Sequence, residues 1–77
     1  MSAHIHKQEL TGGASGVPGT LLDIHEQHGG LYAWYLADGS WTDVEVVPTG
    51  GAPSPGVRYF GTAHGVAGSQ VFHVFVR

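Results

Sequence analysis

Glycine and proline interrupt this sequence so regularly that the segments between them suit strands better than helices. The 77-residue chain contains 13 glycines and 4 prolines. They gather in breaks at residues 11–16, 28–30, 38–40, 49–56 and 65–68. The segments between these breaks are about six to nine residues long, which is the usual length of a β-strand. The spacing predicts an all-β fold, built as a small antiparallel sheet, a sandwich or a partly open barrel.

About six strands are expected, over residues 4–10, 20–27, 31–38, 43–49, 57–63 and 69–77. Residues 31–38 are apolar on both faces, which is typical of a central strand, and residues 69–77 share this character. His28-Gly29-Gly30 predicts a tight hairpin, because glycine adopts positive φ without a Cβ clash. Residues 11–19 are interpreted as a flexible loop. A short helix over residues 18–28 is the alternative, and the Gly-Gly pair that follows it favours the strand.

One domain over residues 1–77 is the expected organisation, because a chain of this length can build only one core. Chains this short often need disulfides, a metal or self-association for stability. The sequence has no cysteine, which excludes disulfides and thiolate metal sites. Apolar residues make up 42% of the chain and no helix is expected to cover a sheet. We therefore expect a homo-oligomer, with its binding site between protomers near residues 49–59.

The charge balance argues against general nucleic-acid binding. The net charge is −3 with neutral histidines, and only Lys7, Arg58 and Arg77 are basic. Binding to a nucleic acid by neutralising its phosphates needs several Lys or Arg side chains on one face. The apolar runs are too short to span a membrane, and the first four residues lack the features of a signal peptide. These features predict a soluble, intracellular protein with no membrane partner.

Six histidines raise the question of a metal site. His4 and His6 are two residues apart on an expected strand, so their side chains share one face and could chelate a metal. A zinc site would need a third ligand, for which His25, His64 and His73 are the candidates. No spacing singles one out, so we predict neither a metal nor any other cofactor. His73 lies between apolar residues and is interpreted as a hydrogen-bonded core histidine.

Catalysis has little support in the sequence. There is no Gly-x-Ser-x-Gly motif, and the serines lie in loops without a histidine and carboxylate nearby. Asp43 and Glu45 share a strand face, but alternating carboxylates are typical of a solvated surface. We therefore expect a binding protein and not an enzyme.

The glycine-rich stretch at residues 48–56 is the strongest local feature. Consecutive glycines such as Gly50 and Gly51 let backbone N–H groups converge on an anion. Thr49 adds a hydroxyl donor, and Arg58 is the only arginine before the C-terminal residue, so it is the candidate clamp for a phosphate or carboxylate. A flexible connection between two strands is the alternative interpretation. No Gly-Lys-[Ser/Thr] follows, so the stretch is not a P-loop.

Aromatic residues form a second candidate feature. Tyr59 follows the glycine-rich stretch, and Trp41 lies in a polar turn where its ring is expected to be exposed. Rings on a sheet can stack on a nucleobase, and they are also common at protein interfaces. Trp34 is interpreted as a core or interface residue. The candidate ligand-binding residues are Trp41, Thr49, Gly50, Gly51, Arg58 and Tyr59.

The order of several motifs resembles a family of short proteins encoded by phages and prophages, including actinobacteriophages. The motifs are His4-Ile5-His6-Lys7, Val17-Pro18-Gly19-Thr20-Leu21-Leu22, Leu31-Tyr32-Ala33-Trp34-Tyr35-Leu36, Thr49-Gly50, Tyr59-Phe60-Gly61-Thr62 and Val71-Phe72-His73-Val74-Phe75. The similarity covers most of the chain. Where family members often have Gly-Thr-Gly-His-Pro, this sequence has Pro48-Thr49-Gly50-Gly51-Ala52-Pro53. A role for a loop histidine is therefore not carried over.

The resemblance implies a phage accessory protein in the cytoplasm of an infected bacterial host. Small phage proteins of this kind commonly act against host defence, either by sequestering a nucleotide second messenger or by occluding a defence protein. The leading functional hypothesis is a non-enzymatic protein that binds a small anionic ligand such as a cyclic nucleotide. The alternative is an inhibitor that binds a host or defence protein through an aromatic patch.

Overall fold

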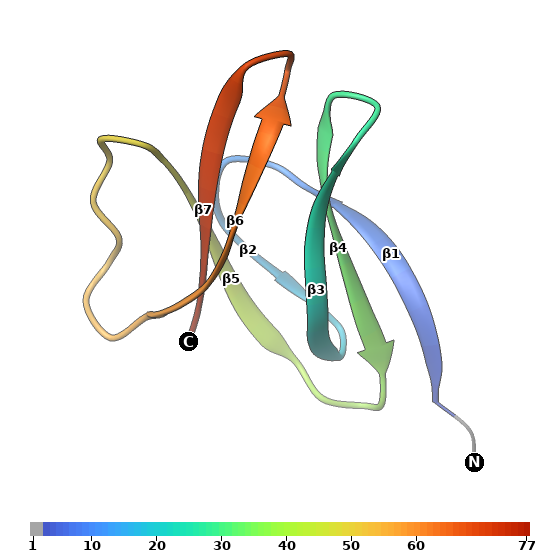
Figure 1. The fold of residues 1–77 in the computed structure, drawn as a ribbon. Coiled ribbons are helices and arrows are strands. Elements are labelled where there is room, and N and C mark those ends of the chain that lie inside the picture. Colours follow the sequence, from blue (N-terminus) through green and yellow to red (C-terminus); the bar gives the residue numbers. More distant parts are fainter. Residues whose placement is uncertain (1–2) are drawn as a thin grey trace.

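Seven strands and their connecting turns account for most of the chain (Figure 1). The computed structural model describes residues 3–77. The expectation that the first four residues form no part of a signal peptide therefore falls partly outside the described residues. The strands are β1 (His4–Leu10), β2 (Gly13–Val17), β3 (Thr20–Gln27), β4 (Gly30–Ala37), β5 (Thr42–Pro48), β6 (Arg58–Val66) and β7 (Gln70–Val76).

The strands form two antiparallel sheets. One has three strands in the order β1-β4-β3, and the other has four in the order β2-β5-β7-β6. Strand β4 is central in the first sheet, as the two-sided apolar pattern of residues 31–38 predicts. The all-β fold class is confirmed, and the structure selects two sheets among the expected architectures. No stretch of residues 3–77 forms a helix capable of crossing a membrane.

The core lies between the two sheets and draws on all seven strands. Alternate residues of each strand face it, because successive side chains on a strand point to opposite sides. Val17, Val44 and Val74 are the largest fully buried side chains. The buried cluster consists of Leu10, Val17, Leu21, Ile24, Leu31, Ala33, Tyr35, Val44, Val46, Ala63, Val66, Val74 and Val76. The described residues bury no polar or charged side chain, so hydrophobic burial holds the sheets together.

The expected hairpin between β3 and β4 is present. His28 and Gly29 both have positive φ, at 54° and 83°, as in a two-residue turn that matches the twist of the strands. The side chain of Glu26 accepts a hydrogen bond from the Gly29 amide at 2.6 Å. The Gly29 carbonyl in turn accepts one from the amide of Ala67, in the β6–β7 turn, at 2.8 Å. This bond links the two sheets at one end of the molecule.

The prediction of a flexible loop at residues 11–19 is wrong. Gly13–Val17 forms β2, an edge strand that pairs with β5 over its whole length. Its composition hides it, because glycine, alanine and serine are poor strand formers. Pairing with β5 and burial of Val17 supply what the local sequence lacks. Strand β2, which adds to the six strands expected, is therefore a product of tertiary structure.

Other strand boundaries differ slightly from those expected. Strand β6 runs to Val66 and not to Ala63, because an irregularity in its pairing with β7 is followed by a further paired residue. Strands β4 and β5 each begin and end one residue earlier than predicted, and β7 is shorter by one residue at each end. The alternative helix over residues 18–28 is excluded, since Thr20–Gln27 forms β3.

Gly19 is expected to tolerate no side chain. A Cβ at this buried position would lie 2.1 Å from the carbonyl oxygen of Leu36, and backbone there cannot rotate away. We predict that Gly19→Ala lowers the free energy of unfolding by about 2–3 kcal/mol, as overpacking typically does. Urea denaturation would measure it.

Gly12→Ala is the matched control for this prediction. Nothing lies within 4 Å of the Cβ that it would add, and Gly12 does not have the positive φ seen at Gly13. Equal stability losses in the two variants would contradict the packing assigned to Gly19.

Candidate functional site

The side of the four-stranded sheet that faces away from the core carries most of the polar and aromatic groups of interest. Val44, Val46, Val74 and Val76 point into the core, so the residues that alternate with them on β5 and β7 point outward. The outward set is Asp43, Glu45, Val47, Val71, His73, Phe75 and, just after β7, Arg77. We call this surface the outer face of the four-stranded sheet.

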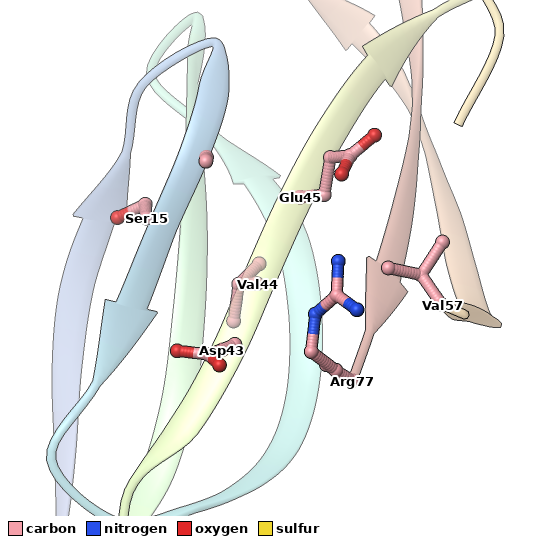
Figure 2. A pocket seen from close by; sticks show the side chains of 7 residues that line it. Ser15, Asp43, Val44, Glu45, Val57 and Arg77 are labelled. Carbon is pink, nitrogen blue, oxygen red and sulfur yellow. The ribbon is translucent and has the colours of Figure 1, made fainter. Parts of the chain in front are cut away.

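Two adjoining pockets form a groove along β5. The first has a volume of about 190 Å³ and is lined by Ala14, Ser15, Asp43, Val44, Glu45, Val57 and Arg77 (Figure 2). The second, of about 430 Å³, lies beneath the loop of residues 49–57 and is lined in part by Gly51, Ala52 and Ser54. Ala14 and Glu45 line both pockets. The groove therefore runs between the edge strand β2 and the glycine-rich loop.

Arg77 supplies the positive charge of the groove. Its amide donates a hydrogen bond to the Asp43 carbonyl at 3.2 Å, which extends the pairing of β7 with β5. Its guanidinium points along the groove between β5 and Val57 (Figure 2). One nitrogen, Nη1, lies 3.4 Å from the Pro55 carbonyl. A guanidinium has five N–H donors, so this contact leaves capacity for a ligand.

Both carboxylates of the groove already accept hydrogen bonds from the protein. Asp43 Oδ1 accepts one from the indole Nε1 of Trp41 at 2.7 Å. Glu45 Oε2 accepts one from the Ser54 amide at 2.8 Å. Hydrogen bonding to Ser54 lowers the pKa of Glu45 and outweighs the opposing effect of desolvation, and the nearby positive charge of Arg77 lowers the pKa further. Their remaining oxygens can still accept hydrogen bonds from a ligand.

The glycine-rich loop is fastened to the sheet at several points. The Thr49 amide donates to the Val71 carbonyl at 3.3 Å, and the Gly51 amide donates to the Pro48 carbonyl at 2.9 Å. Val47 is only 6% exposed although it points away from the core, because the backbone of Gly51 lies directly over it. The loop is thus an anchored cover on the sheet, with Glu45–Ser54 as its central attachment.

A row of hydrogen-bonded side chains crosses the outer face from β5 to β6. Thr49 Oγ1 lies 2.9 Å from His73 Nε2, and His73 Nδ1 lies 3.0 Å from Thr62 Oγ1. Thr62 Oγ1 is in turn 2.7 Å from the hydroxyl of Tyr59. His73 is a half-buried, hydrogen-bonded histidine on the outer face and not in the core. Both of its ring nitrogens contact threonine hydroxyls, whereas a catalytic triad would place a carboxylate on one of them.

Two exposed aromatic rings lie on the outer face, Tyr59 at the end of this row and Trp41 beside Asp43. Trp41 is 62% exposed and Tyr59 is 60% exposed. The Trp41 ring lies over Gly16 of β2, so close that a Cβ there would meet the indole at 2.3 Å. Tyr59 packs edge-on against Phe75, with ring centroids 5.8 Å apart. Neither ring lines the two pockets, but Trp41 lies next to the groove through its hydrogen bond to Asp43, and Tyr59 lies on the same face beside Phe75.

The structure brings most of the candidate ligand-binding residues to this face. Thr49 and Tyr59 are joined through His73 and Thr62, Gly51 lines the second pocket, and Trp41 bonds to a groove carboxylate. Gly50 makes the positive-φ turn of the loop, with φ of 94°.

Arg58 is separated from the other candidates. It pairs with Val76, which faces the core, whereas its neighbour Tyr59 pairs with Phe75 on the outer face. The guanidinium in the groove is that of Arg77, which sequence reasoning passed over because of its terminal position. The alternation of residues 73, 75 and 77 contained the signal that Arg77 shares a face with His73.

The histidines do not gather into a metal site. His6 stacks on Tyr35, with ring centroids 5.8 Å apart. His25 and His73 lie on different sheets. Among residues 3–77, no three His, Cys, Asp or Glu side chains lie close enough together to hold a metal ion.

A scan against protein-family models found no match, and searches of curated proteins and of solved structures found none either. The functional assignment therefore depends on the site itself and on the motif resemblance described above.

Glu45 is expected to make the attachment of the loop depend on pH. Its pKa is lowered in the folded protein, so the attachment is present above the unfolded pKa and is lost as the pH falls through the folded pKa. We predict that hydrogen exchange at the Ser54 amide, corrected for its intrinsic pH dependence, accelerates over this acidic range. NMR exchange measurements would test this.

Glu45→Gln is the matched control, because the amide oxygen can still accept from Ser54 but does not titrate in this range. Protection of Ser54 in this variant should be independent of acid pH. The same acid-induced acceleration in both proteins would show that Glu45 is not the titrating group.

Proposed function

We propose that this protein is a non-enzymatic binder of a small anionic ligand of the nucleotide type, held in the groove of the outer face of the four-stranded sheet. The observation that carries the proposal is the combination of one guanidinium and two carboxylates in a single groove, with two exposed aromatic rings on the same face of the sheet. The motif resemblance supports a role as a phage accessory protein that sequesters a nucleotide second messenger of host defence.

Each part of a nucleotide has a matching group in or beside the groove. Arg77 provides parallel N–H donors for a phosphate. Tyr59 and Trp41 offer exposed ring faces for stacking a base. Asp43 and Glu45 offer acceptor oxygens, which suit the hydroxyls of a ribose or the exocyclic amine of a base.

The two carboxylates limit which anions fit. They lie beside a single arginine, so a compact, highly charged ion such as inorganic phosphate would meet more repulsion than attraction. A nucleotide spreads its charge and also carries hydroxyl and amine donors. This pattern favours a ligand that presents both an anionic group and several hydrogen-bond donors.

Binding would be tested by thermal shift and calorimetry against cyclic dinucleotides, cyclic trinucleotides and cyclic ADP-ribose isomers, with inorganic phosphate as the reference anion. We expect micromolar or tighter binding of at least one nucleotide, and much weaker binding of phosphate. No nucleotide binding in that range would exclude the proposal.

Arg77→Ala should weaken nucleotide binding by at least about tenfold, because a hydrogen bond to a charged group contributes about 1.5–3 kcal/mol. Arg58→Ala is the matched control. It removes the same charge from an exposed position that points away from the groove. If Arg58→Ala weakened binding as much as Arg77→Ala, the ligand would lie outside this groove.

A second candidate function, the binding of a host or defence protein, is favoured by the exposure of Trp41 and Tyr59 on one face. Exposed aromatic residues beside hydrogen-bonded polar groups are typical of interface hot spots. The β2 edge also lies beside Trp41, where a partner strand could add to the sheet.

Affinity purification from host lysate separates the two candidates. A protein inhibitor should recover one stoichiometric partner, and Trp41→Ala should abolish its capture while circular dichroism shows that the variant still folds. A ligand binder should recover no such partner and should instead release a small molecule on denaturation, detected by native mass spectrometry.

A further inference from the structure

The outward side of the three-stranded sheet carries a second surface that the proposed function does not use. Leu31, Ala33 and Tyr35 of β4 point into the core, so Tyr32, Trp34 and Leu36 point outward along the middle of the sheet. We call this surface the outer face of the three-stranded sheet. It lies on the opposite side of the sandwich from the groove.

The central stripe of this face is apolar and only partly covered. Tyr32, Trp34 and Leu36 are half-buried. Ile5 beside them on β1 is 65% exposed, and Leu22 on β3 is 45% exposed. A stripe of large apolar side chains bordered by charges is typical of a protein interface.

The polar side chains on the two sides of the stripe are complementary in two successive rows. Trp34 lies between Lys7 of β1 and Asp23 of β3, because all three are register partners. In the next row, Tyr32 lies between Glu9 of β1 and His25 of β3.

This pattern is complementary to itself under one simple symmetry operation. A two-fold axis parallel to β4, between two copies packed face to face, places β1 of each copy opposite β3 of the other. Lys7 then faces the partner's Asp23, and Glu9 faces the partner's His25, each pair occurring twice. The aromatic stripes of the two copies meet at the axis, as an isologous interface requires.

The geometry points to a homodimer formed by the outer faces of the three-stranded sheets, with β4 of the two copies parallel. Stacked sheets are about 10 Å apart, a spacing that the side chains of Lys7 and Asp23 can bridge. In the single chain the Lys7 side chain leans across the stripe, since its Nζ donates to Gln27 Oε1 on β3 at 2.7 Å and lies 5.0 Å from the Tyr32 ring centroid. In the dimer this exposed side chain exchanges Gln27 for the partner's Asp23 by standing out from β1, which also uncovers the Tyr32 ring for the partner.

This dimer leaves both grooves on its outside. Each would then be formed by a single chain, whereas the sequence predicts a site between protomers. The interface does not depend on the identity of the ligand, so it can be tested independently of the proposed function.

Sedimentation equilibrium of the full chain and of charge-exchanged variants tests the dimer. Wild-type protein should be dimeric at micromolar concentrations. Lys7→Glu and Asp23→Lys should each raise the dissociation constant by at least about tenfold, because each turns two attractive pairs per dimer into two repulsive ones. The double variant should recover the wild-type constant to within about threefold, because the pairs reform with exchanged signs.

Arg58→Glu is the matched control, since it makes the same change of charge at an exposed position on the other sheet and should leave the dimer intact. Circular dichroism and thermal melting of each variant would verify that it folds.

Three outcomes would overturn the proposal. Wild-type protein that stays monomeric at hundreds of micromolar has no such interface. If the single variants dimerise as tightly as the wild type, the interface lies elsewhere. A double variant as weak as the single variants excludes this arrangement, since an antiparallel packing would instead place Lys7 opposite the partner's Glu9.

Discussion

The pairing of β5 with β7 supports the rest of the molecule. These two strands are the inner members of the four-stranded sheet, and their valines Val44, Val46, Val74 and Val76 form its contribution to the core. The pairing joins segments about thirty residues apart in sequence, so it must offset a substantial loss of chain entropy. Burial of the valines against the other sheet provides the stabilisation. The edge strand β2 and the glycine-rich loop are then arranged on this frame.

The same pairing creates the candidate site, because side chains on a strand alternate. When the valines of β5 and β7 turn inward, Asp43, Glu45 and Arg77 must turn outward on neighbouring strands. The alternation of side chains on β5 and β7 thus determines both the apolar core and the charged groove. The loop of residues 49–57 completes the groove, and its attachment through Glu45 and Ser54 links the shape of the site to the ionisation of one carboxylate.

The two sheets are chemically different on their outward sides. The four-stranded sheet presents a groove with hydrogen-bonded polar groups and rings at its borders. The three-stranded sheet presents an apolar stripe between Lys7 and Glu9 on one strand and Asp23 and His25 on the other. The first pattern suits a small ligand with several donors and an anionic group. The second suits a flat surface of matching charge, which a second copy of the chain provides.

The sequence by itself determined the strand content, the β3–β4 hairpin and the central place of residues 31–38, because these depend on local alternation and on turns that glycine permits. It also identified Trp41, Thr49 and Tyr59 as candidate site residues. Tertiary structure alone decided that Gly13–Val17 is a strand, since its small residues carry no pattern and pairing with β5 holds it. It also decided that Arg77 and not Arg58 enters the groove. The alternation along β7 puts Arg77 on the face of His73, but only the pairing of β7 with β5, which are distant in sequence, brings it beside Asp43 and Glu45.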